Sequence, residues 1–228
     1  MQTKEPTPKE RFLNSLSNFI QTNKVILIIL VSAIAAFLIA FAVISEVNKS
    51  IIEKSTTLAE QVQQDYSDWI SETEESKKNE LESSILEQID EILEKYSRRY
   101  AGQRVLFVRG NVFFEKEEWE QSANDFLTVA GDFPESYLAP ISMVNAATAY
   151  EEAGMIDKAI EVYNNYIDKY EEFTYDIPRA LFTLGRLYEL KDDVESAKDT
   201  YNKLIDNFPS SGWTNLVRNR IIYLNIKE

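Results

Sequence analysis

Hydrophobic residues recur at helical spacing in four short segments of the chain that share one form. Each segment carries apolar residues three or four positions apart and then an aromatic residue; the segments read IDEILEKYS, FLTVAGDFP, YNNYIDKY and YNKLIDNF. They begin at residues 89, 126, 163 and 201, so successive starts are separated by 37, 37 and 38 residues. A purely helical pattern with a period in this range predicts a helical solenoid.

A second set of helical segments lies between the first. Each runs for about three turns and ends on an aromatic residue; the three segments are residues 103–114, 139–150 and 177–188. Pro140 and Pro178 lie near the starts of two of them, where a missing amide hydrogen costs little. Each unit is therefore predicted to be a pair of antiparallel helices. Residues 81–96 are predicted as a lone leading helix and residues 212–227 as a closing cap.

An uncharged apolar run precedes the repeats. Residues 25–45 contain no charged side chain between Lys24 and Glu46. At about 1.5 Å per residue, a helix of this length spans the roughly 30 Å of a hydrocarbon core. The run therefore predicts a transmembrane helix in contact with the lipid bilayer. A cleaved signal peptide is the alternative, since residues 40–42 read Ala-Phe-Ala and resemble a small-x-small cleavage site.

The segments beside the apolar run indicate an orientation. Four basic residues precede the run and two lysines follow it closely: Lys4, Lys9, Arg11 and Lys24, then Lys49 and Lys54. The positive-inside rule places the N-terminus in the cytoplasm and the rest of the chain outside. Five apolar residues upstream are spaced as in an amphipathic helix at the membrane surface or in a helical extension of the span: Phe12, Leu13, Leu16, Phe19 and Ile20.

A helical neck is expected between the span and the repeats, at residues 46–78. Its apolar residues recur on one helical face: Val47, Ile51, Leu58, Val62, Tyr66 and Trp69. This stripe could pair with a second copy in a homodimer or pack on the domain that follows. The polar stretch SETEESKKNE at residues 71–80 is typical of a hinge or an exposed helical turn. The predicted domains are residues 1–24, 25–45, 46–78 and 79–228.

Composition narrows the classes of function. The formal charge of −14 disfavours the phosphate contacts on which nucleic-acid binding depends. The chain has no cysteine and no histidine, which removes thiolate metal sites, cysteine nucleophiles and the commonest general base. We therefore expect neither an enzyme nor a cofactor. A pair of carboxylates could still perform acid and base catalysis, but 38 acidic residues make any one pair uninformative.

The small and aromatic positions of the units resemble the tetratricopeptide repeat family. The third unit fits its pattern well, with Leu181, Leu184, Gly185, Tyr188, Ala197, Tyr201 and Pro209. The second contains Met143, Ala146, Ala147, Tyr150, Gly154, Ala159 and Tyr163, but has Glu171 where proline is expected; the first contains Phe107, Phe114, Ala123, Leu127 and Ala130, with Asn111 at a small position and Pro134 one place early. We expect Ala123, Ala159, Ala197, Gly185, Tyr163 and Tyr201 to pack the helices together.

This resemblance implies an all-α fold: an N-terminal transmembrane helix, a helical neck and an α-solenoid of about three units with a leading and a capping helix. It also implies a scaffold that binds proteins. In the family, the first helix of each unit lines a concave groove. The corresponding residues here are Val105, Val108, Val112, Ile141, Val144, Thr148, Arg179, Phe182 and Arg186. The alternative is that the closing helix or the neck covers this groove, and most of its apolar residues are then inaccessible to a partner. A second basic cluster, either a docking patch or a solvated face, consists of Arg98, Arg99, Arg104 and Arg109.

The whole architecture resembles the ancillary SecYEG translocon subunit family of bacterial inner-membrane proteins. The stretches that carry this likeness are RFLNSLSNFIQTNKVILIILV and VRNRIIYLNI. It implies a single-pass protein of the inner membrane with a periplasmic domain, and translocon subunits, periplasmic chaperones or emerging clients as partners. A structural scaffold of another envelope complex, such as a flagellar motor, division or cell-wall machinery, is the alternative.

Overall fold

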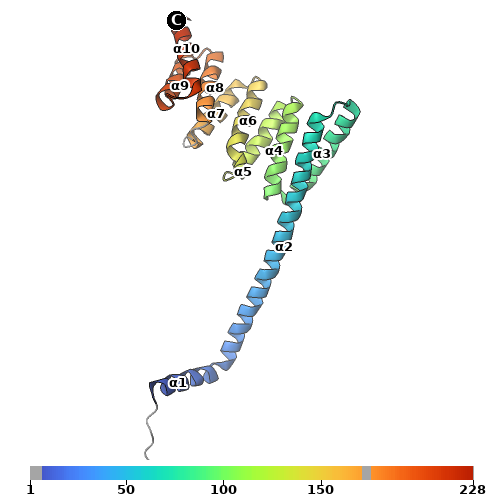
Figure 1. Cartoon of the computed structure of the whole chain (residues 1–228), viewed down its shortest axis with the longest axis vertical. Coiled ribbons are helices and arrows are strands. Elements are labelled where there is room, and N and C mark those ends of the chain that lie inside the picture. The colour runs from blue at the N-terminus through green and yellow to red at the C-terminus, as the bar shows by residue number, and fades with distance from the viewer. Residues whose placement is uncertain (1–6, 171–175, 228) are drawn as a thin grey trace, which may run out of the picture. The chain divides into compact units, whose positions relative to one another are not determined.

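The computed structural model describes residues 7–170 and 176–227, and within these ranges the chain forms ten α-helices and no β-strand. Lys4 and Glu171, which were named in the sequence patterns, lie outside the described residues. The all-α fold predicted from the sequence is confirmed (Figure 1). The chain divides into two compact units, Met1–Glu53 and Lys54–Glu228, and one helix runs through the boundary between them.

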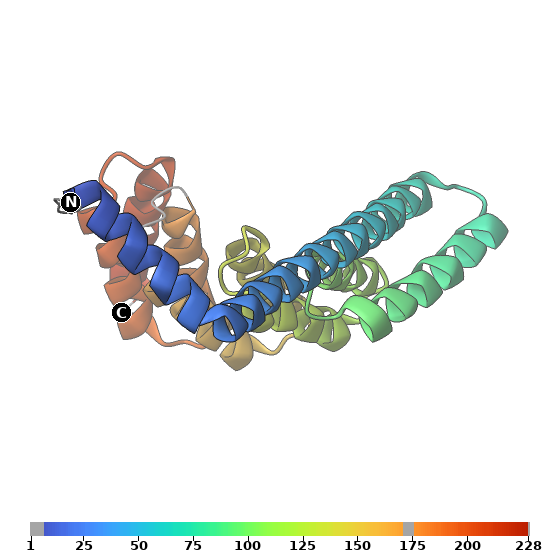
Figure 2. The same cartoon turned by 90° about the horizontal axis from the view of Figure 1, so that it is seen from below.

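The first unit begins with two separate helices, α1 (Pro8–Thr22) and α2 (Lys24–Ser71). A capping box starts α1: the Thr7 hydroxyl accepts from the Glu10 amide at 3.4 Å, and the Glu10 carboxylate accepts from the Thr7 amide at 2.7 Å. At the other end, Asn23 leaves helical geometry and its side-chain amide donates to the Phe19 carbonyl at 2.9 Å. Figure 2 shows the change of direction between the two helices. The amphipathic segment is therefore a helix of its own and not an extension of α2.

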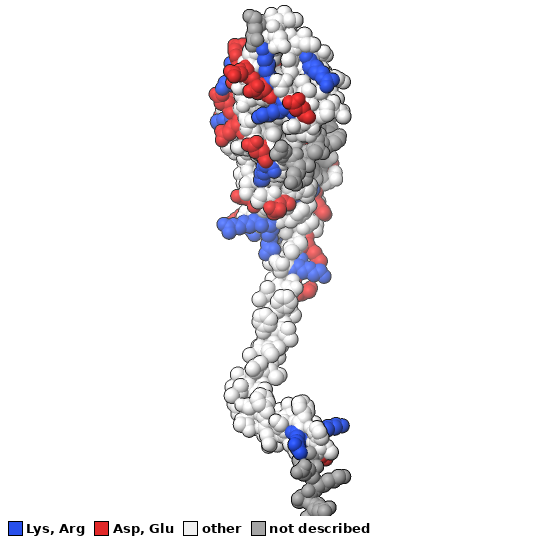
Figure 3. Space-filling view, turned by 90° about the vertical axis from the view of Figure 1, so that its left-hand side faces the viewer, with Lys and Arg blue, Asp and Glu red and all other residues white. Residues whose placement is uncertain are grey.

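The apolar run 25–45 forms the first part of α2. Its best 18-residue window has a mean hydropathy of 3.1 and buries none of its residues. In the described part of the chain, α2 is the one helix that is long and apolar enough to cross a membrane. Figure 3 shows this stretch as a segment without charged side chains. A membrane span and a signal sequence share these properties.

The last part of α2 packs on the domain that follows, which is one of the two alternatives for the apolar stripe of the neck. It forms one apolar core with α3 (Glu75–Tyr96) and α4 (Tyr100–Glu115), made of Ala59, Val62, Trp69, Ile85, Ile89, Ile92, Ala101, Val105, Val108 and Val112. Only residues 72–74 separate α2 from α3, and the two helices lie side by side in Figures 1 and 2. The predicted leading helix is present as α3, but it is not alone, because the apolar stripe of α2 packs against it.

Three further helix pairs and a cap follow. They are α4 with α5 (Trp119–Asp132), α6 (Leu138–Glu152) with α7 (Ile156–Lys169), α8 (Ile177–Leu190) with α9 (Val194–Asn207), and the closing helix α10 (Gly212–Lys227). The predicted solenoid of about three units with a capping helix is therefore present. Residues 72–74 connect α2 to α3 and residues 75–78 form the first turn of α3, and the compact unit that contains the repeats begins at Lys54.

Small residues bring the two helices of each pair together. Ala123, Ala159 and Ala197 have no exposed surface. A Cβ added to Gly110 would lie 2.9 Å from the Phe126 ring, and one added to Gly185 would lie 2.2 Å from the Tyr201 ring. The helices approach so closely because a hydrogen atom stands where other residues carry a side chain. Tyr163 and Tyr201 are buried in the same core.

Candidate protein-binding groove

A groove of about 400 Å³ lies between α6 and α8 on the second unit. Helix α6 and the residue before it supply the apolar side, and α7 and α8 supply most of the polar groups. The lining residues are Tyr137, Pro140, Ile141, Val144, Asn145, Thr148, Tyr163, Tyr166, Asp176, Arg179, Ala180 and Thr183.

The apolar side of the groove is open to solvent. Ile141 is 49% exposed and Tyr137 is 63% exposed, while Val144 and Thr148 are half-buried. These residues share one face of α6 because they recur three or four positions apart. The Tyr137 side chain is held in place by α4, since Arg104 Nη1 donates to its hydroxyl oxygen at 2.8 Å.

Two tyrosines form the inner wall. Burial raises the pKa of Tyr163, and burial followed by the negative charge of Asp176 raises the pKa of Tyr166 to about 12. Both phenols are therefore neutral at physiological pH. The Tyr163 hydroxyl lies 3.5 Å from the Thr148 hydroxyl. The groove thus combines aliphatic surface with neutral hydroxyl groups.

Arg179 supplies the basic group of the groove. It is exposed, and it forms no ion pair with any of the residues that the structure describes. An exposed guanidinium group can bind a carboxylate in two parallel hydrogen bonds.

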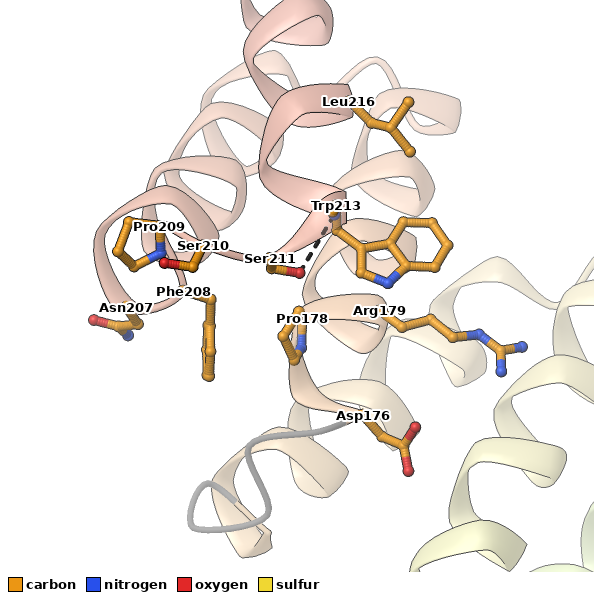
Figure 4. A pocket seen from close by; sticks show the side chains of 11 residues that line it. Asp176, Pro178, Arg179, Asn207, Phe208, Pro209, Ser210, Ser211, Trp213 and Leu216 are labelled. Carbon is orange, nitrogen blue, oxygen red and sulfur yellow. Dashed lines mark hydrogen bonds between the residues drawn. The ribbon is translucent and has the colours of Figure 1, made fainter.

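A second hollow of about 850 Å³ adjoins the same arginine. It lies between the start of α8 and the turn from α9 to α10, and Asp176 and Arg179 line both hollows. Figure 4 shows Pro178, Phe208, Trp213 and Leu216 among its apolar lining residues. The Trp213 amide donates to the Ser211 hydroxyl at 3.3 Å, which helps to start α10 beside this hollow.

The structure brings four of the nine predicted groove residues together: Ile141, Val144, Thr148 and Arg179 all line the groove. For Val105, Val108 and Val112 the prediction is wrong. These valines are at most 1% exposed, because α2 and α3 cover this face of α4 and use it as core.

The last two predicted residues on α8 point to other neighbours. The Phe182 ring packs against Trp213 of α10, with ring centroids 5.0 Å apart, and against Tyr201. Arg186 forms an ion pair with Glu151 of α6. Neither lines the groove, which lies over Arg179, Ala180 and Thr183, so the accessible face of α8 is turned relative to the predicted one. Sequence reasoning missed Tyr137, Tyr166, Asp176 and Thr183; the spacing of Thr183 from Arg179, one helical turn, was the available signal.

The four arginines of the predicted basic cluster have different surroundings. Arg109 is held in the protein by both carboxylate oxygens of Asp125, at 2.7 and 2.9 Å, and by Asp90 at 3.0 Å. Arg104 is bound to Tyr137 and lies over the Tyr100 ring. Arg98 is exposed and Arg99 is half-buried. Arg109 therefore joins α3, α4 and α5.

In a chain without histidine or cysteine, the carboxylates are the side chains that could hold a metal ion or transfer a proton. No cluster of three or more His, Cys, Asp or Glu side chains that could hold a metal ion occurs among the described residues. Hydrogen bonds to backbone amides lower the carboxyl pKa of Glu72, and hydrogen bonds with Ser196 lower that of Asp193.

The fold and the groove define a tetratricopeptide-type α-solenoid, and comparison with known proteins gives the same class. Residues 142–172 and 179–211 match the tetratricopeptide repeat family. A tetratricopeptide repeat-containing protein of Treponema pallidum (strain Nichols) is 31% identical over 116 residues. That match covers 51% of this chain, and the chain spans 48% of the length of the relative.

Solved structures share the fold at low identity. A tetratricopeptide repeat protein from Parabacteroides merdae has a TM-score of 0.56 at 15% identity, covering 75% of this chain and 61% of that one. The tetratricopeptide-like repeats of a putative kinesin light chain from Podosopora anserina have a TM-score of 0.53 at 9% identity, covering 75% of this chain and 85% of that one. These structures therefore share the fold of the repeat unit, and the two matched segments are similar to tetratricopeptide repeats, which commonly serve as scaffolds for protein–protein interaction.

Proposed function

We propose that this protein is a membrane-anchored, non-catalytic module that binds a protein segment in the groove between α6 and α8. The observation that carries the proposal is the combination of exposed aliphatic surface at Ile141 with an exposed guanidinium at Arg179 in one groove. An extended or helical segment with apolar side chains and an acidic group or a C-terminal carboxylate fits this lining.

The apolar run 25–45 is proposed to cross the membrane once. None of the residues in its most apolar window is buried in the described structure, which supports this assignment, because a helix with this hydropathy needs an apolar solvent. The excess of basic residues before the run supports a cytoplasmic N-terminus. The repeat unit would then lie on the outer side of a bacterial inner membrane. The residues after the run contain 36 acidic and 20 basic side chains, so anionic lipid headgroups would repel the unit from the membrane surface.

The more specific role that we propose is that of an accessory to the Sec translocon, linking the channel to periplasmic chaperones or emerging clients. The likeness of the stretch at residues 11–31 to the ancillary translocon subunits supports it. A scaffold in a flagellar motor, division or cell-wall complex would use the same groove for a different partner.

In-cell crosslinking followed by mild detergent extraction and purification of the full chain distinguishes these roles. Recovery of channel subunits is the expected result. Recovery of motor, division or cell-wall proteins without channel subunits would contradict the translocon role and leave the binding module intact. A full-length protein that is extracted from membranes at alkaline pH would contradict the membrane span. Cleavage of the chain at residues 40–42 would contradict it as well.

A further inference from the structure

We infer that α1 is a lipid-binding helix that lies along the membrane surface, with its apolar face in the acyl chains and its polar face in water. The inference depends on the proposed membrane span, because the position of α2 in the bilayer determines how close α1 lies to the membrane surface. It assigns a partner to a surface that the groove does not explain.

The apolar side chains of α1 form one continuous stripe. At 100° per residue, Phe12, Leu13, Leu16, Phe19 and Ile20 occupy about 120° of the helix circumference, a third of it. The opposite face carries Glu10 and Arg11 near its start and then uncharged polar side chains: Asn14, Ser17, Asn18 and Gln21. All five apolar side chains are exposed, by 43% to 67%, and α1 buries none of its residues. A stripe of this size needs a partner.

The chain itself limits what that partner can be. One residue, Asn23, separates the last residue of α1 from the first residue of α2. The uncharged run of α2 begins at residue 25, so α1 ends within a few residues of the edge of the hydrocarbon core. A helix tied to this depth meets the headgroup layer first. Amphipathic helices of this kind bury their apolar face at the boundary between headgroups and acyl chains.

The ends of α1 are built for this position. The capping box at Thr7 and Glu10 satisfies amide donors at the start, and the Asn23 side chain caps the Phe19 carbonyl at the end. These bonds let the helix stop short of the span and change direction. Lys9 and Arg11 lie near the start of the stripe and Lys24 lies just past its end, and Glu10 is the one acidic residue of α1, which suits the phosphate groups of lipid headgroups.

The test measures depth along two faces of α1 in the full chain. The chain has no cysteine, so single spin labels can be placed by Leu16→Cys on the apolar face, Asn18→Cys on the polar face and Phe37→Cys in the span. Each variant is reconstituted as a single copy in nanodiscs of phosphatidylcholine and phosphatidylglycerol. Collision with oxygen reports the bilayer interior, and collision with a water-soluble nickel chelate reports the aqueous phase.

We expect the oxygen-to-nickel ratio to be several-fold higher at position 16 than at position 18, and highest at position 37. Equal, water-like ratios at positions 16 and 18 with a bilayer-like ratio at position 37 would overturn the inference while leaving the span in place. That outcome would assign the stripe to a protein partner or a second copy, both of which are absent from these nanodiscs. A water-like ratio at position 37 would instead overturn the span and the inference with it.

Discussion

Gly185 of α8 lies directly under the ring of Tyr201 of α9, so that a Cβ on Gly185 would come within 2.2 Å of the ring. The Tyr201 hydroxyl donates to the Glu189 carboxylate at 2.5 Å, and that carboxylate also accepts from Arg220 of α10 at 2.7 Å. The Tyr201 ring that packs on Gly185 is therefore connected through Glu189 to the capping helix α10. The second hollow lies beside the start of that helix.

Gly185→Ala should destabilise the repeat unit by about 1–3 kcal/mol, the usual cost of overpacking a core. The methyl group would displace the Tyr201 ring, which outweighs the higher helix propensity of alanine. Urea unfolding followed by circular dichroism measures the change. Gly131→Ala is the matched control, because a Cβ at Gly131 meets nothing within 4 Å and should be neutral or stabilising. Equal stability of the two variants would contradict the close contact.

The turns inside the three helix pairs each contain one residue with left-handed backbone geometry. These residues are Glu117, Gly154 and Asp192, with φ of 60°, 69° and 57°. Because a side chain is unfavourable there, Glu117→Gly should stabilise the protein by about 0.5–1 kcal/mol. Gly154→Ala should destabilise it by a similar amount. The same unfolding measurement checks both, and a loss of stability in Glu117→Gly would contradict the assigned turn.

Asp125 and Asp90 bind the same arginine but differ in burial. The side chain of Asp125 is 10% exposed and that of Asp90 is 73% exposed. Asp125→Asn should therefore cost on the order of 1–3 kcal/mol, since it leaves a partly buried Arg109 without its bidentate partner. Asp90→Asn should cost less than about 0.5 kcal/mol, as exposed ion pairs do. Comparable losses in both variants would show that the pair with Asp125 does not organise α4 and α5.

Tyr166 makes the stability of the repeat unit fall at alkaline pH. Its pKa is about 12 in the folded protein against 10.0 for a free tyrosine side chain, because burial disfavours the charged phenolate. The folded state then holds this proton more tightly than the unfolded state. The resulting stabilisation is complete below about pH 10 and is lost as the pH rises towards 12. In thermal unfolding across this range, Tyr166→Phe should lose less stability than the wild type, and parallel curves would contradict the burial of the phenol.

The repeats were predictable because each unit places similar residues in the same structural position. The period of 37 or 38 residues located α4 to α9, and Ala123, Ala159 and Ala197 marked where the helices touch. The left-handed turns at Glu117 and Asp192 gave no such signal, since glycine occurs only at residue 154 of the three.

The groove was only half predictable because exposure depends on which helices cover a face. The stripe containing Val62 and Trp69 could pair with another chain or with its own domain, and its packing on α3 and α4 buries Val105, Val108 and Val112. On α8, contacts of Phe182 with α10 turn the accessible face towards Arg179 and Thr183. Both effects come from terminal helices that lie outside the regular repeat pattern.

Site-specific photo-crosslinking tests the binding groove most directly. A benzophenone amino acid is placed in the full chain at Ile141, which is 49% exposed and lines the groove, or at Leu190, which is 59% exposed and lies outside it. Irradiation in cells should give a discrete protein adduct from position 141 that is absent from position 190 and is lost when Arg179→Glu is added. The charge reversal should leave the unfolding temperature unchanged, because the Arg179 side chain is exposed. The same adducts from both positions, or an adduct from position 141 that is indifferent to Arg179→Glu, would contradict a groove that recognises an acidic protein segment.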